Sequence, residues 1–233
     1  MNAITRGGIE FIAVLFGLSI SLWIDNTAKE NELKIQNKKI LNRLYHNLLA
    51  DSTDGTWNFK AYERGIKGSE NVIKWCDSNP TFSSIDDSIE KDISAMMITT
   101  IFVHNEEEYI ALKNSGRTDL ITNEDLVIKL HDYYTRIGFI KTLDAFQYDF
   151  VRTKIIPFLS DYSDENLFIE GAENSVVYEN FPKINLYKMP ELKKMRFYAS
   201  NMLTWQRYTK SWYKGQVRRV TEIRKLLREE LNL

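Results

Sequence analysis

Arg43 and His46 are the residues of this sequence best placed for acid–base chemistry, because they lie three positions apart in a segment with helical periodicity. Helical nucleases place an arginine and a histidine a few residues apart for catalysis on RNA. The spacing here is too short for the usual helical nuclease motif, and His46 is expected on the surface of its helix. The pair therefore predicts no nuclease activity.

Metal ligands and nucleophiles are few and scattered. The three histidines are widely separated, without the one-turn spacing of a metal-binding pair, and the single Cys76 cannot form an intramolecular disulfide. Glu106, Glu107 and Glu108 lack partner carboxylates at the spacing of a cation site, and they are expected at the start of a helix capped by Asn105. There is no glycine-rich phosphate loop and no nucleophile elbow. The sequence predicts no metal, no cofactor and no catalytic residue.

Glu10 is notable because it lies near the start of the most apolar segment of the chain. Residues 11–24 carry no charge, and the apolar run counted from Gly7 reaches eighteen residues. That is about the lower limit for crossing a hydrocarbon core of roughly 30 Å. A core helix and a cleaved signal peptide are the alternatives, but Trp23 is placed like an interfacial anchor and no small-x-small cleavage site follows. The sequence predicts a transmembrane helix over residues 7–25.

The charges that flank this helix predict its orientation. Arg6 and the amino terminus precede it, whereas five basic residues follow it, namely Lys29, Lys34, Lys38, Lys39 and Arg43. Cytoplasmic flanks are enriched in lysine and arginine. We therefore expect a single-pass protein of the inner (cytoplasmic) membrane, with the N-terminus outside and the C-terminal domain in the cytoplasm.

One stripe of the predicted span combines the carboxylate with small residues. Glu10, Ala13, Gly17 and Ser21 fall on the same side of a helical wheel, and the last three have the small-xxx-small spacing that lets membrane helices pack closely. A carboxylate exposed to lipid costs roughly 2.5 to 3.5 kcal/mol at the bilayer centre, so Glu10 is expected to face protein or water. The stripe predicts self-association. The alternative is that Glu10 reaches the headgroups and the small residues have no role.

Two blocks resemble a family of bacterial single-pass membrane proteins that is catalogued as a domain of unknown function. In the first block the matching residues are Glu10, Gly17, Ser21, Leu22, Ile24 and Asn26, while Trp23 and Asp25 depart from the family pattern. The second block, residues 108–134, has the Ser-Gly, Leu-Ile and closing Tyr-Tyr features. The resemblance implies a membrane span followed by a cytoplasmic helical domain. It implies no activity, because the family has none assigned.

The rest of the chain is divided by its periodicity and its turn residues. We expect a short N-terminal tail over residues 1–6, a membrane-proximal stalk helix over 26–50 and a cytoplasmic helical domain over 51–233, with an irregular connector near 160–190. The cluster Asp51 to Gly55 predicts a turn, which would make the stalk and the next helix a hairpin.

Further helices are predicted in the cytoplasmic domain. They span residues 84–99, a short stretch that starts after Asn105 and ends at Gly116, residues 124–159 after an Asn123 cap, and the C-terminal region from Pro190 onward.

The closing helix interleaves aromatic and basic residues. Trp205, Tyr208, Trp212 and Tyr213 alternate with five cations, namely Arg207, Lys210, Lys214, Arg218 and Arg219. Such a pattern could contact anionic lipid or nucleic acid. However, Met202, Trp205, Tyr208 or Thr209, and Trp212 also have the spacing of a core-facing stripe, and nucleic acid is the least favoured partner. Residues 191–233 carry eleven basic and four acidic residues, so residues 1–190 have a net charge of −8 and offer these cations an internal partner.

Together these patterns predict an all-α protein with one N-terminal transmembrane helix that continues into a cytoplasmic helical bundle. We expect a non-enzymatic homo-oligomer in contact with membrane lipids, with an unidentified protein partner, acting as a scaffold, a regulated pore or a membrane-perturbing effector. The alternative is a monomeric, membrane-tethered binding module that uses the basic aromatic helix.

Overall fold

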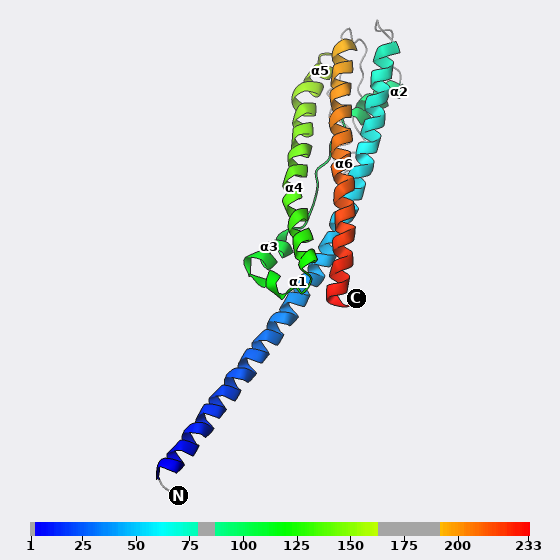
Figure 1. The fold of residues 1–233 in the computed structure, drawn as a ribbon. Coiled ribbons are helices and arrows are strands. Elements are labelled where there is room, and N and C mark those ends of the chain that lie inside the picture. Colours follow the sequence, from blue (N-terminus) through cyan, green and yellow to red (C-terminus); the bar gives the residue numbers. More distant parts are fainter. Residues whose placement is uncertain (1–2, 79–86, 163–191) are drawn as a thin grey trace.

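The computed structural model describes residues 3–78, 87–162 and 192–233. Of these residues 90% are helical and none is in a strand, so the predicted all-α fold is confirmed. The longest element, α1 (Ala3–Ser78), is one unbroken helix of 76 residues, about 110 Å long at 1.5 Å per residue. Its N-terminal part projects alone from the bundle, and α6 (Leu192–Leu231) ends close to the point where α1 leaves it (Figure 1).

The bundle is built from three long helices that lie side by side, the C-terminal part of α1, α4 and α6 (Figure 1). The other elements are α2 (Asp87–Met96), α3 (Glu107–Asn114), η1 (Arg117–Leu120), α4 (Glu124–Phe150), η2 (Val151–Ile155) and α5 (Ile156–Ser160). Residues 98–106, here called the strap, form no helix and run along the bundle from α2 to α3. The strap therefore reverses the chain direction without adding a long helix.

The core consists of two apolar clusters at different heights of the bundle. The first surrounds Leu44, Leu48 and Tyr133 near the end of α6, and the second surrounds Val72, Met96 and Met202 near its start. Between them lie buried polar side chains, listed in order along the chain: Ser69, Asp144, Gln147, Gln206 and Thr209. Buried polar groups need hydrogen-bond partners, so this layer fixes how the helices face one another.

The predicted turn at Asp51 to Gly55 is wrong, because α1 continues through it to Ser78. Asp51 is 1% exposed and accepts hydrogen bonds from the strap. A Cβ atom on Gly55 would lie 3.2 Å from Cγ2 of Val217, so the glycine allows α6 to approach. These turn-forming residue types are used for packing, and the stalk and the following segment are one helix instead of a hairpin.

Several predicted helix ends can be compared with the structure. The Asn123 cap is confirmed, since its Oδ1 accepts from the Leu126 amide at 3.1 Å, and Gly116 has the expected left-handed conformation with φ of 66°. The Asn105 cap is wrong, because Glu106 is the N-cap residue and Asn105 belongs to the strap. The predicted helix 124–159 is confirmed, with one wider turn at Val151–Ile155.

Three predictions fall on residues that the structure does not describe, in whole or in part. They are the start of the helix at 84–99, the connector near 160–190 and the beginning of the last helix at Pro190. They remain predictions.

Candidate functional site

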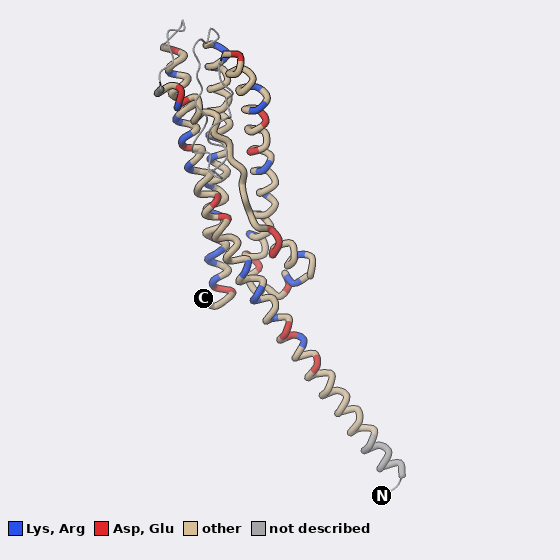
Figure 2. Tube along the Cα trace, turned by 180° about the vertical axis from the view of Figure 1, so that it is seen from behind, with Lys and Arg blue, Asp and Glu red and all other residues tan. Residues whose placement is uncertain are grey.

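The apolar segment of α1 makes no contact with the bundle. Residues 11–26 are exposed along their whole length, and the helix is long and apolar enough to cross a membrane. Figure 2 shows that charged residues are absent from the described part of this segment until Asp25, where a run of mixed charges begins. Trp23 is 69% exposed at the end of the apolar run, the position of an interfacial anchor.

Ala13, Gly17 and Ser21 lie on this exposed helix, as the sequence predicted, whereas the side chain of Glu10 is outside the described residues. A Cβ atom added to Gly17 would meet nothing within 4 Å. By contrast, a Cβ on Gly68 of the same helix would lie 2.7 Å from the Asp92 carbonyl oxygen. Packing within the chain explains Gly68, but it gives no reason for glycine at position 17.

Several cations of α6 contact carboxylates of the same chain. Arg207 pairs with Glu70 at 2.6 Å and Lys210 with Glu63 at 2.9 Å, so both cations are used in the contact with α1. Exposed ion pairs contribute little to stability, typically below about 1 kcal/mol. These pairs offset part of the positive charge of α6, and the predicted internal partner is present.

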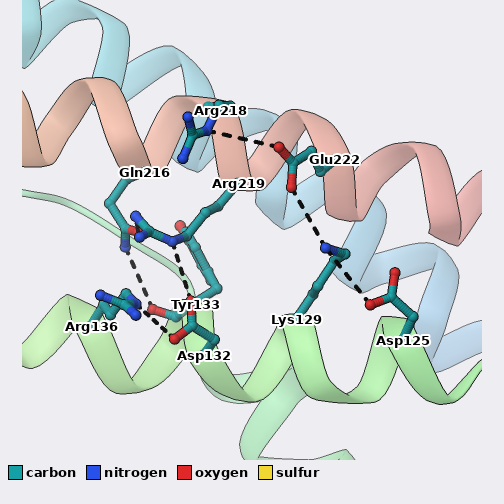
Figure 3. A network of polar contacts seen from close by, with 9 residues as sticks. All are labelled: Asp125, Lys129, Asp132, Tyr133, Arg136, Gln216, Arg218, Arg219 and Glu222. Atoms are coloured by element: carbon teal, nitrogen blue, oxygen red, sulfur yellow. Dashed lines mark hydrogen bonds and ion pairs between the residues drawn. The ribbon is translucent and has the colours of Figure 1, made fainter.

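A second group of ion pairs joins α6 to α4. Arg219 lies 3.2 Å from Asp132, and Glu222 contacts both Lys129 at 3.7 Å and Arg218 at 3.8 Å (Figure 3). Arg136 and Asp125 extend the network along α4 (Figure 3). Of the five predicted anionic-partner residues, four are thus engaged within the chain, while Lys214 is exposed.

The buried side of α6 is not the one predicted, because it lies next to the predicted aromatic stripe around the helix. Met202 and Thr209 are buried as expected, but Tyr208 is 45% exposed, and Trp205 and Trp212 are only partly buried against α4. The other core positions are taken by Gln206 and Tyr213. The aromatic residues line the boundary between α4 and α6.

Sequence reasoning missed a buried carboxylate at the centre of the bundle. Asp144 on α4 is 3% exposed, and its Oδ1 accepts from the Tyr62 hydroxyl at 3.0 Å. Its Oδ2 accepts from the Tyr213 hydroxyl at 2.5 Å and from the Phe102 amide at 3.2 Å. One carboxylate therefore links α1, α4, α6 and the strap.

Two further carboxylates hold the strap against α1. The Val103 amide donates to Asp54 at 3.0 Å, and the Asn105 amide donates to Asp51 at 3.0 Å. Asp51 also accepts from the Tyr133 hydroxyl at 2.8 Å. An extended segment without a neighbouring strand needs other acceptors for its amides, and these aspartates supply them.

Amide side chains complete the layer. Gln206 Nε2 donates to the Met96 carbonyl at 2.8 Å, while its Oε1 accepts from the Ser69 hydroxyl at 2.9 Å. Gln147 Nε2 donates to the Thr209 hydroxyl at 2.7 Å. The layer is a structural network, because most of its donors and acceptors are directed at one another, while Gln147 Oε1 has no partner among the described residues.

Burial gives Asp144 an unusual protonation equilibrium. Desolvation raises the pKa of Asp144 to about 7, although three hydrogen bonds favour its charged form. Burial also raises the pKa values of Asp51 and Asp54. The folded state therefore favours the neutral carboxyl groups more than the unfolded state does.

We expect stability to fall as the pH rises towards 7. Because the folded pKa of Asp144 is raised, its stabilising contribution is complete below the unfolded value near 4 and is lost as the pH rises through about 7. The free energy of unfolding should decrease by about 1 kcal/mol per pH unit between pH 5 and 7 relative to Asp144→Asn, which cannot titrate. Thermal unfolding at several pH values measures this slope. Parallel profiles for the two proteins would contradict it.

Metal-binding side chains do not cluster in the described part of the chain. Among the described residues no group of three His, Cys, Asp or Glu side chains could hold a metal ion. Arg43 makes two hydrogen bonds to Glu108, at 2.6 and 3.0 Å, and His46 is exposed, as the sequence predicted. The features that stand out are the free apolar segment and the unbroken helix that joins it to the bundle.

Comparison with known proteins gives no relative from which an activity could be transferred. No family model, no curated protein and no solved structure matches this chain.

Proposed function

We propose that the protein is a non-enzymatic membrane assembly that self-associates through the Ala13, Gly17 and Ser21 face of its N-terminal helix. The observation that supports this most directly is the free space around Gly17 in an exposed apolar helix. Glycine inside a helix costs roughly 0.5 to 1 kcal/mol relative to alanine. That cost is offset when the glycine lets another membrane helix approach.

The proposed placement is a single pass through the inner membrane, with the N-terminus outside and the bundle in the cytoplasm. The lysines after the apolar segment support this orientation. In a ring of copies, Glu10 would lie on the associating face and would favour cations over anions in any lumen. A regulated pore or another membrane-perturbing effector is the activity that such an assembly would have.

The unbroken course of α1 supports a mechanical link between the membrane and the bundle. Leu44 and Leu48, both fully buried, lie on the same helix as Gly17 and in the same rigid element. A hinge would have allowed the anchor and the domain to move independently. With one helix, a change in packing at the span moves the residues that contact α4 and α6.

The competing function, a monomeric module that binds a partner through the basic helix, has less support. Arg207, Lys210 and Arg219 already pair with carboxylates of the chain. An external anion would have to compete with these contacts. The mass of the protein in nanodiscs separates the two functions, because the binding module would be a monomer and the assembly an oligomer.

Gly17→Leu is expected to reduce the mass of the protein in nanodiscs from an oligomer to a monomer. The leucine side chain would occupy the space through which a second helix approaches, while the bundle would keep its stability because no described residue lies within 4 Å of a Cβ atom at this position. Native mass spectrometry or light scattering measures the mass. Ser19→Leu, on the opposite side of the same helix, is the matched control and should keep the wild-type mass. A wild-type monomer would refute the proposed assembly.

A further inference from the structure

A cavity of about 420 Å³, here called the basic cavity, lies near the end of α6, close to the point where α1 leaves the bundle (Figure 1). This volume is within the range of sites that hold small ligands. Tyr45 of α1 lines the cavity together with four charged residues of α6, namely Arg224, Lys225, Arg228 and Glu229. The lining side chains thus carry three positive charges and one negative charge.

The three cations are neighbours on the surface of α6. Arg228 follows Arg224 by four residues and Lys225 by three, and both spacings bring side chains together on a helix. Like charges at these spacings destabilise a helix by a few tenths of a kcal/mol. The stability of α6 therefore gives no reason for three cations at this place.

The cations of the basic cavity have no carboxylate partner. Within the described part of the chain none of the three forms an ion pair, although Glu229 lines the same cavity. This distinguishes them from Arg207, Lys210 and Arg219, each of which pairs with a carboxylate of α1 or α4. A cleft lined by charge of one sign concentrates ions of the opposite sign, so the basic cavity attracts anions.

Tyr45 holds the guanidinium group of Arg224 in place. Arg224 Nη2 donates to the Tyr45 hydroxyl at 2.9 Å, and Cζ lies 4.6 Å from the centroid of the Tyr45 ring. The Nε and Nη1 atoms of Arg224 have no acceptor in the described part of the chain. An arginine fixed in this way loses little further conformational freedom when its remaining donors bind the oxygens of a phosphate group.

The segments outside the described residues are attached far from this cavity. Residues 163–191 connect α5 to α6, and both attachment points lie at the opposite end of the bundle (Figure 1). Arg224 lies 32 residues after Leu192, which is about 48 Å along α6. A segment of this length, held at both ends, covers such a distance and returns only when it is almost fully extended. These residues are therefore a poor source of the missing anion.

We propose that the basic cavity binds a small ligand through a phosphate group that carries at least two negative charges. Arg224 donates to the phosphate oxygens, and Lys225 and Arg228 neutralise the remaining charge. The cavity has room for more than one phosphate group, so a phosphate ester or a short polyphosphate fits it. This inference goes beyond the proposed membrane assembly and does not depend on it.

The position of the cavity favours a soluble phosphate over a lipid headgroup. Tyr45 lies 21 residues beyond Ile24, the end of the apolar run, which corresponds to about 31 Å along α1. The headgroup region extends only about 5 to 8 Å beyond the hydrocarbon core. A headgroup would reach the cavity only with α1 strongly tilted. Because both sources offer the same phosphate chemistry, the experiment has one arm for each.

Titration of pyrophosphate into the full chain in phosphatidylcholine nanodiscs tests the soluble source. Calorimetry should show saturable binding, and Arg228→Gln should raise the dissociation constant roughly tenfold or more, because a charge-assisted contact is lost. Arg224→Gln should weaken binding at least as much. Lys214→Gln removes an exposed cation elsewhere on α6 and is the matched control, which should bind as the wild type does. Circular dichroism checks that each variant remains folded; Arg228 is exposed, so its replacement leaves the core unchanged.

Native mass spectrometry of the full chain from nanodiscs that contain phosphatidylglycerol tests the lipid source. If pyrophosphate does not bind, but the wild type and Lys214→Gln retain phosphatidylglycerol while Arg228→Gln loses it, the site stands with a headgroup as its ligand. Binding of neither probe, or binding that Arg228→Gln and Arg224→Gln leave unchanged, would overturn the proposal. The mass of Gly17→Leu decides the membrane assembly separately from either result.

Discussion

Asp144→Ala is expected to destabilise the bundle by about 3 to 5 kcal/mol, the largest effect of any single change considered for this protein. The substitution removes the shared acceptor of the Tyr62 and Tyr213 hydroxyls and of the Phe102 amide. Each buried donor left without a partner costs roughly 1 to 3 kcal/mol, and some relaxation reduces the sum. The midpoint of thermal unfolding, followed by circular dichroism, should fall by about 10 °C.

Asp149→Ala provides the matched control for this prediction. Asp149 lies on the same helix as Asp144, but its side chain is 63% exposed. Its ion-pair partner Arg152, whose Nη2 lies 3.3 Å from the Asp149 Oδ1, is exposed to the same extent. Its removal should change stability by no more than about 0.5 kcal/mol. Similar unfolding temperatures for the two variants would mean that the buried network contributes nothing.

The position of the strap could not be predicted from the sequence, because its partners are distant along the chain. The amides of Phe102, Val103 and Asn105 donate to aspartates that lie 42, 49 and 54 residues away. Local propensity shows only a short apolar stretch between two helices. The hydrogen bonds that make the extended conformation stable arise once α1 and α4 are already in place.

The continuity of α1 was visible in the sequence, but residue type concealed it. Buried positions along its core side are spaced alternately by three and four residues, in the order Leu41, Leu44, Leu48, Asp51, Gly55, Asn58 and Tyr62. Asp51 and Gly55 are residue types that favour turns and caps, and they therefore predicted a break. The spacing continued through them, and in this bundle spacing was the better guide than propensity.

In α6, too, the spacing of buried positions was a better guide than residue type. Its buried residues follow a four–three alternation through Met202, Gln206, Thr209, Tyr213 and Gln216. Two of these are glutamines, whereas the adjacent positions carry large aromatic residues that appeared better suited to a core. Gln206 is buried because the polar layer satisfies its amide, and Gln216 is buried with its Nε2 donating to the Tyr133 carbonyl, while the aromatic residues lie at the α4 boundary. The candidate membrane span needed no such long-range information, because its apolar run is local.

Gly68→Ala is expected to destabilise the bundle by about 1 to 3 kcal/mol, although alanine favours helix. A Cβ atom at this position would lie 2.7 Å from the Asp92 carbonyl oxygen and 2.8 Å from the Met96 amide nitrogen. Both atoms belong to the backbone of α2, so the collision cannot be relieved by rotating a side chain. The helix α2 must move away from α1, which opens the packing of Val72 and Met96.

Gly138→Ala isolates this collision from the general effect of replacing glycine. Gly138 lies within α4, and a Cβ atom there would meet nothing within 4 Å. Both substitutions restrict the unfolded chain to the same extent, which favours folding by about 0.4 to 1 kcal/mol. Gly138→Ala should therefore raise the midpoint of thermal unfolding, whereas Gly68→Ala should lower it. Equal increases would show that α2 can withdraw from α1 at no cost, and that the close contact at Gly68 does not determine where α2 packs.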